Sequence, residues 1–165
     1  MLAEISFYNF VLFLHITGVV IAFGVVFTYP LVFAVARRSH QRHLPFFHTL
    51  QGLIGQRVIS TFGTLILLAG FYLAIEGPYD FSDPWIGSTL LILIIILGGG
   101  GAYLGPNEQR LAELSRRDVD ASPPDGPVSF SAEYEQLYAR TRAVTLAFLG
   151  LVLVAIFLMV TKLGA

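Results

Sequence analysis

Residues 6–36 are the feature that most constrains what this chain can fold into. They contain no Asp, Glu, Lys or Arg. A helix needs about 20 apolar residues to cross the hydrocarbon core of a bilayer, and backbone groups in lipid must be paired within the segment. The whole chain is 13% charged, whereas soluble proteins carry about 25% charged residues. The run therefore predicts a membrane-spanning helix, with the lipid bilayer as the main surroundings of the protein.

Three further stretches, uncharged except at their end residues, predict three more spans. They cover about residues 57–76, 85–106 and 142–162, and runs such as residues 90–96 are apolar on every face, which excludes the alternation of a barrel strand. The fold class that we expect is all-α, a four-helix transmembrane bundle of two helical hairpins, and residues 1–165 form a single integral membrane domain. The N-terminal residues lack a basic region, so we expect the first span to be retained rather than cleaved.

The connection between the third and fourth spans, about residues 107–135, is predicted to be a long cytoplasmic loop. Its first part, Asn107–Arg117, is polar and expected to be helical, and the Pro- and Gly-rich stretch 118–129 is typical of a flexible loop. Ser131 is an expected N-cap, because its hydroxyl can accept from a first-turn N–H and acidic residues follow it.

Basic residues indicate the orientation, since they gather in two of the three connections. These residues are Arg37, Arg38, Arg42 and Arg57 around the first connection, and Arg110, Arg116, Arg117, Arg140 and Arg142 in the third. The middle connection carries only acidic charges. The positive-inside rule then predicts both arginine-rich connections in the cytoplasm and both termini outside, N-out and C-out. The basic and aromatic Arg37–Arg42 loop is expected to meet anionic lipids, while a net charge of −1 gives no indication of nucleic acid.

His15 is the candidate functional residue, because it lies about 14 Å into the first span and ionisable groups at that depth are costly. Neutral imidazole could ligate a haem iron, relay a proton or hydrogen-bond across helices, and the residue pattern leaves these alternatives open. Tyr8 and Ala22 share its helix face, with Gly18 beside them. Arg57 either extends to the interface or meets an anionic ligand group such as a propionate.

The other histidines do not lie at the depth of His15. We expect His40, His43 and His48 to form a solvated interfacial face rather than a metal cluster, and no cysteine joins them. A haem on His15 would then be five-coordinate, or would take Met159 or the His15 of a second subunit as its other ligand.

Small residues form two further patterns. Gly98–Gly101, followed by Gly105 and Pro106, predicts either tight helix packing or a local break, since glycine disfavours helix by up to about 1 kcal/mol. The pairs Gly18/Ala22 and Gly101/Gly105 are spaced as close-packing faces, and they are candidate interfaces in a homo-oligomer or with a partner membrane subunit.

The first span contains a pattern of spaced residues, Leu14-His15-Ile16, Phe23-Gly24, Phe27, Pro30 and Phe33, and a weaker pattern runs from Arg57-Val58-Ile59 to Gly70. In these residues the chain resembles HemJ-type protoporphyrinogen oxidases and copper-resistance D-type membrane domains. The four-span plan is similar to that of a small bacterial family of predicted integral membrane proteins of unknown function. The chain departs from the HemJ pattern at Ala22 and Leu31, and it has neither Lys nor His in its third span.

These resemblances imply a multi-pass protein of the bacterial cytoplasmic (inner) membrane. They also imply haem b or a porphyrin as cofactor, with His15 as metal ligand and Arg57 at the propionates. Tyr8, Gly18 and Ala22, which lie on the helix face of His15, are the further candidate cofactor-binding residues. The function expected on this basis is a redox role for a haem- or porphyrin-binding protein. The alternative is a non-enzymatic membrane subunit that binds partner proteins or lipids, and the sequence leaves open whether the protein is an enzyme.

Overall fold

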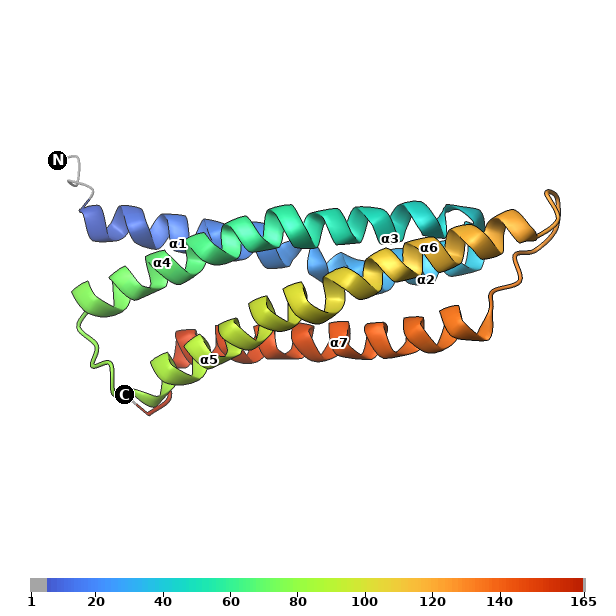
Figure 1. Cartoon of the computed structure of the whole chain (residues 1–165). Helices are drawn as coiled ribbons and strands as arrows, with labels where there is room; N and C mark the ends of the chain where they lie inside the picture. The colour runs from blue at the N-terminus through green and yellow to red at the C-terminus, as the bar shows by residue number, and fades with distance from the viewer. Residues whose placement is uncertain (1–5, 165) are drawn as a thin grey trace.

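The computed structural model describes residues 6–164 and consists of four long helical rods (Figure 1). The first rod contains α1 (Phe7–Gly24), η1 (Val26–Thr28) and α2 (Tyr29–Ser39). The second contains η2 (Gln41–His43), α3 (Leu44–Leu53), η3 (Ile54–Ile59) and α4 (Ser60–Glu76). The third contains α5 (Pro84–Gly99), η4 (Gly100–Leu104) and α6 (Gly105–Ala121), and the fourth is α7 (Ala132–Thr161). The predicted all-α four-helix bundle is confirmed.

The rods pair differently along their length. At one end α1 packs on α4 and α5 packs on α7, so the first two rods and the last two rods form two hairpins (Figure 1). At the other end α3 packs on α6, which joins the second rod to the third. A core of Ala22, Phe23, Ile66, Ile96 and Val152, with further apolar residues around it, connects the hairpins between these ends.

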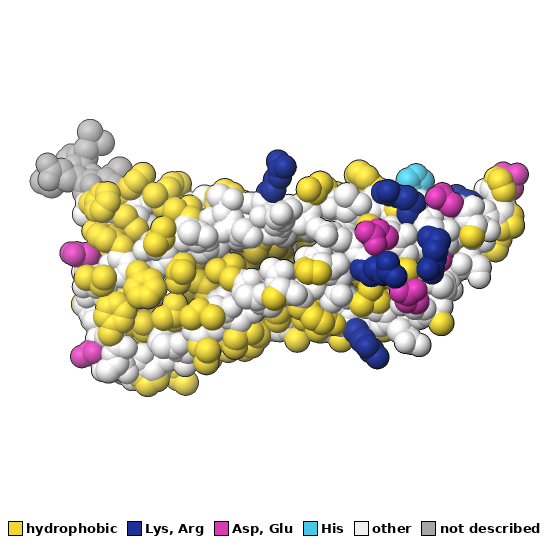
Figure 2. Space-filling model, in the orientation of Figure 1, with side chains coloured by type: hydrophobic (Ala, Val, Ile, Leu, Met, Phe, Trp, Pro, Cys, Tyr) yellow, Lys and Arg dark blue, Asp and Glu magenta, His cyan; other side chains and the backbone are white. Residues whose placement is uncertain are grey.

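The rods are longer than a membrane requires, and the excess lies at the charged end. They have 33, 36, 38 and 30 residues, and at 1.5 Å per residue even the shortest reaches about 45 Å, against a hydrocarbon core of about 30 Å. Figure 2 shows hydrophobic side chains over most of the length and most of the charged side chains gathered where α2, α3 and α6 lie, with a few acidic ones at the opposite end. Large apolar residues such as Phe13, Leu68 and Val160 are exposed in the apolar part, which suits a lipid-facing surface.

The predicted long loop at residues 107–135 is mostly helix. Helix α6 continues to Ala121 and α7 begins at Ala132, so the irregular part covers residues 122–131. Ser131 is the N-cap of α7, as predicted, and its Oγ accepts from the backbone N–H of Tyr134. The Asp118 carboxylate in turn accepts from both the N–H and the hydroxyl of Ser131, each at 2.8 Å. These hydrogen bonds connect the end of α6 to the start of α7.

The glycine run does not break the third rod. Gly99 is a close-packing position, because a Cβ there would lie 2.5 Å from Cζ of Phe148. Beyond it, Gly100–Leu104 form a turn of π-helix and the rod continues. Of the two predicted alternatives, tight helix packing is found at Gly99. Beyond it the helix does not break but widens into one π-helical turn.

The proposed interface residues Gly18 and Ala22 are buried inside the chain. A Cβ on Gly18 would lie 3.1 Å from Cγ1 of Ile66 in α4, and Ala22 belongs to the central core. They pack this chain's own helices and offer no face to a second subunit. Residues Met1–Ile5, which supported the expectation of a retained first span, lie outside the described residues.

Candidate ligand cavity between two π-helical segments

A cavity of about 350 Å³ lies between the second and third rods. Its walls include Gly55, Gln56 and Ile59 of η3, and Gly100, Gly101 and Leu104 of η4. Both segments are π-helix, in which the N–H of Ser60 bonds to the carbonyl of Gly55 and the N–H of Gly105 to that of Gly100. Single π-turns inside α-helices are rare, and those that occur frequently lie at functional sites. Two of them facing one cavity make this region the first candidate for function.

Glycines keep the cavity open. Among the described residues, no atom lies within 4 Å of where a Cβ would stand at Gly55, Gly100 or Gly101. A side chain at these positions would therefore project into the space without a clash. Val26, Ile96 and Leu97 supply apolar surface to the rest of the wall.

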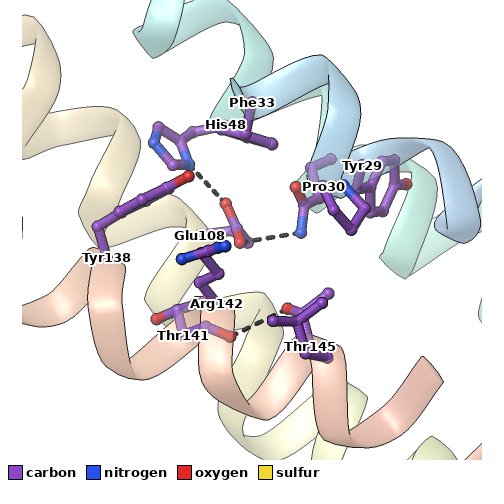
Figure 3. Close-up of a pocket in the computed structure, with 11 residues that line it drawn as sticks. Tyr29, Pro30, Phe33, His48, Glu108, Tyr138, Thr141, Arg142 and Thr145 are labelled. Carbon is purple, nitrogen blue, oxygen red and sulfur yellow. Dashed lines mark hydrogen bonds and ion pairs between the residues drawn. The ribbon is translucent and has the colours of Figure 1, made fainter. Parts of the chain in front are cut away.

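Glu108 is the centre of a buried polar cluster at one end of the cavity. It is 4% exposed, and its Oε2 lies 2.7 Å from Nδ1 of His48 while its Oε1 accepts from Nε2 of Gln51 at 3.0 Å. On the far side of the imidazole, Nε2 of His48 lies 3.0 Å from the Tyr134 hydroxyl. The cluster joins α3, α6 and α7, and Figure 3 shows the contact of His48 with Glu108.

The hydrogen-bond directions in this cluster follow from its chemistry. A carboxylate only accepts, so Nδ1–H of His48 donates to Glu108. Burial raises the pKa of Tyr134, so its hydroxyl keeps its proton. Tyr134 is fully buried and His48 is 1% exposed. The pair therefore holds the Glu108 carboxylate in position.

Glu108 also lines a smaller cavity of about 30 Å³ (Figure 3). Tyr138, Thr141 and Arg142 of α7 line it, together with Pro30 and Phe33 of α2. Its volume suits about one water molecule.

Two buried polar atoms, on residues that line both cavities, have no hydrogen-bond partner among residues 6–164. They are the Tyr29 hydroxyl and Oε1 of Gln51, on side chains that are 8% and 9% exposed. The amide orientation of Gln51 is fixed by chemistry, because its NH2 must face the Glu108 carboxylate and its oxygen must face away. Buried polar groups are almost always hydrogen-bonded, so these atoms indicate a polar partner in the space that the two cavities form.

Two arginines expected to meet anionic lipids are bound within the chain. Arg37 donates to both carboxylate oxygens of Glu135 at 2.8 Å, and its guanidinium lies 4.4 Å from the centre of the Tyr138 ring. Arg42 bonds to the carbonyls of Pro123 and Gly126, the second at 3.1 Å. Contact of the Arg37–Arg42 segment with anionic lipids stays a prediction, for which exposed Arg38 is the available cation.

His15 lies away from this cavity, in the interface of α1 with α4. Its Nδ1 lies 3.1 Å from the carbonyl of Ile66, and a Cβ on Gly70 would be 3.2 Å from its Cε1. Of the alternatives that the sequence leaves open, this geometry corresponds to a hydrogen bond across helices. His15 lines neither of the two cavities described above.

The other residues predicted for a site with His15 do not gather around it. Tyr8 packs with Val11, Ala69 and Leu73 near the end of α1. Arg57, in η3, is exposed, and it lies about 13 Å along the helix from Ile66. Gly18 and Ala22 serve packing, as described above.

His48 is the functional candidate that sequence reasoning missed, because it was assigned to a solvated face. That assignment is wrong, since His48 is buried and hydrogen-bonded at both nitrogens. Leu44, His48 and Gln51 recur at helix spacing on one face of α3, and all three are buried, so the pattern was available in the sequence. The rings of His40 and His43 lie 6.1 Å apart, and no group of three or more His, Cys, Asp and Glu in the described part of the chain could hold a metal ion.

The apolar rods, the charged end and the buried polar cluster define a polytopic integral membrane protein. The chain matches, over residues 9–163, the model of the family described as "Predicted integral membrane protein (DUF2269)". It therefore belongs to this family and is an integral membrane protein with four membrane-spanning helices. No curated protein and no solved structure matches it.

Proposed function

We propose that this protein is a non-enzymatic membrane protein that binds a small amphiphilic molecule in the cavity between η3 and η4. The observation that carries the proposal is the pair of unpartnered, buried polar atoms on Tyr29 and Gln51 at the wall of a cavity of molecular size. Ligand pockets are mostly apolar and contain a few placed polar groups, and this cavity has both kinds of wall.

The place of the cavity along the rods supports an amphiphile over a fully polar ligand. The apolar stretches of the second and third rods begin beside it, and the charged end begins with Glu108 and Gln109. A molecule with a polar head group and an apolar tail would satisfy both regions at once. The burial of His48 and Tyr134 favours binding over catalysis, because neither the imidazole nor the phenol of the cluster lines the large cavity.

Cavity-filling variants test the proposal. Gly101→Leu places a side chain into the cavity, whereas Gly98→Leu, in the same glycine run, adds one to a position that has open space and does not line the cavity. Native mass spectrometry of the purified protein should detect a small molecule retained by the wild type and by Gly98→Leu and lost from Gly101→Leu. Equal retention by all three, or no retained molecule in any, would reject the proposal.

Haem or porphyrin binding through His15 stays a prediction. One observation favours it. Nδ1–H of His15 donates to the Ile66 carbonyl, so its Nε2 keeps an unshared lone pair, which is the arrangement usual for a metal-ligating histidine. The purified protein, with and without added hemin, should then give a Soret band that Tyr8→Phe retains and His15→Ala loses. A colourless wild type that does not respond to hemin would reject this second candidate.

A further inference from the structure

We infer that the cavity selects an amphiphile whose head group is a primary ammonium, held by the Glu108 carboxylate and the oxygens around it. This inference rests on the proposed function, and it names the chemical class of the ligand. It follows from the hydrogen-bond donors and acceptors that line the cavity wall.

The polar atoms at the buried end of the cavity are mostly acceptors. Within the described part of the chain, Oε1 of Gln51 has no donor, and each oxygen of Glu108 receives one, from His48 or from Gln51, although a carboxylate oxygen can accept two. The hydroxyls of Ser60 and Thr145 donate hydrogen bonds to the backbone carbonyls of Gly55 and Thr141, respectively. Their oxygens therefore also face a ligand as acceptors, and the Tyr29 hydroxyl can act in either sense.

The charge at the cavity wall is negative, so it favours the same kind of head group as the surplus of acceptors does. Among the described residues that line the large cavity, Glu108 is the only charged one, and no Lys or Arg nitrogen in the described chain lies within 4.0 Å of its carboxylate. Its neighbour His48 donates through Nδ1 and is buried away from the cavity. An anionic head group would meet a carboxylate and a ring of lone pairs, which is unfavourable on both counts.

A primary ammonium matches this wall because it carries a positive charge and three N–H donors. A quaternary ammonium has the charge without donors, so it would leave Oε1 of Gln51 unpaired. An alcohol has one donor and no charge. The apolar side chains of Val26, Ile59, Ile96 and Leu97 then line the space for an alkyl tail.

The test compares four probes of equal tail length, octylammonium, octyltrimethylammonium, 1-octanol and octyl sulfate. Binding is measured by titration of the protein in phosphatidylcholine nanodiscs, with protein-free nanodiscs as the blank for partition into lipid. Octylammonium should bind at least about tenfold more tightly than each of the other three, since hydrogen bonds to charged groups are the stronger ones. Glu108→Gln should remove most of this preference, while Glu113→Gln, an exposed carboxylate on the same helix, should keep it.

Thr145→Val supplies a second variant in case Glu108→Gln fails to fold, because it removes one acceptor and keeps the side-chain shape. It should weaken octylammonium severalfold and leave 1-octanol unchanged. If octyltrimethylammonium or octyl sulfate binds as tightly as octylammonium, and Gly101→Leu abolishes binding of all probes, the inference fails and the proposed function stands. If no probe binds above the blank, both fail.

Discussion

Breaking the His48–Glu108 pair should destabilise the protein far more than breaking an ion pair at its surface. In His48→Leu the Glu108 carboxylate, 4% exposed, keeps only the Gln51 donor, and the Tyr134 hydroxyl loses its contact with the imidazole. Removing one partner of a buried charged pair costs about 3–5 kcal/mol. The exposed pairs that Arg110 makes with Glu113 and Glu133, whose side chains are 52%, 69% and 51% exposed, should each contribute about 0–1 kcal/mol.

A double-mutant cycle separates the pair from the packing around it. His48→Leu/Glu108→Leu removes the buried charge along with its partner, so the double variant should be more stable than His48→Leu alone. Reversible unfolding in mixed micelles, followed by circular dichroism, gives the free energy of unfolding of the wild type, the single variants, the double variant and Arg110→Ala. A loss in His48→Leu no larger than that in Arg110→Ala, or a double variant less stable than both single variants, would refute the reasoning.

Three further predictions concern the connection, the orientation and the packing. Burial alone would raise the pKa of Asp118, but the hydrogen bonds it accepts lower it below its ordinary value. This stabilisation is present above that ordinary value and is lost as the pH falls below about 4, so Asp118→Asn should flatten the acid limb of a stability–pH curve measured by thermal unfolding. The chain has no cysteine, and in intact bacterial cells an impermeant maleimide should label Ser82→Cys and not Asp125→Cys if the arginine-rich end faces the cytoplasm; the reverse pattern would invert the topology. Gly63→Ala should cost about 1–3 kcal/mol in the same micelle assay, because its Cβ would lie 2.5 Å from Cδ2 of Leu97, and an unchanged stability would show that the leucine moves aside freely.

The four-helix bundle could be predicted because it depends on length and polarity alone. Uncharged runs long enough to cross a bilayer have few folds open to them, and the N-cap at Ser131 needs only local chemistry. The same local reading placed residues 37–56 and 107–135 in connections, since they are polar. It predicted helix over residues 107–117, but it did not foresee helix α3 or the packing of α3 on α6. Helices α3 and α6 are polar on one face and buried on the other, with His48 and Glu108 pointing inward. This arrangement follows only from the packing of the two helices on each other.

The candidate site was less predictable, because its parts lie far apart in the chain. His15 drew attention through its depth in an apolar run, yet one backbone carbonyl of a neighbouring helix satisfies its Nδ1. His48 looked ordinary among charged neighbours, and its partner Glu108 belongs to another rod. The π-turns are also hidden in the sequence, since the glycines of η4 suggest either packing or a break, and η3 contains a single glycine.

The cavity arises from the way the second and third rods change partners. On one side of η3 the second rod packs on the first through α4, and on the other side it packs on the third through α3. The third rod makes the corresponding change at η4, from α7 against α5 to α3 against α6. Straight helices in contact on one side of such a change must diverge on the other, and the space where they diverge is the cavity. The π-turns widen each rod at that level, and the glycines leave the space unfilled. Because the buried Glu108 cluster holds the rods together on the charged side, the cavity has a polar end fixed by hydrogen bonds and an apolar end formed by side chains alone.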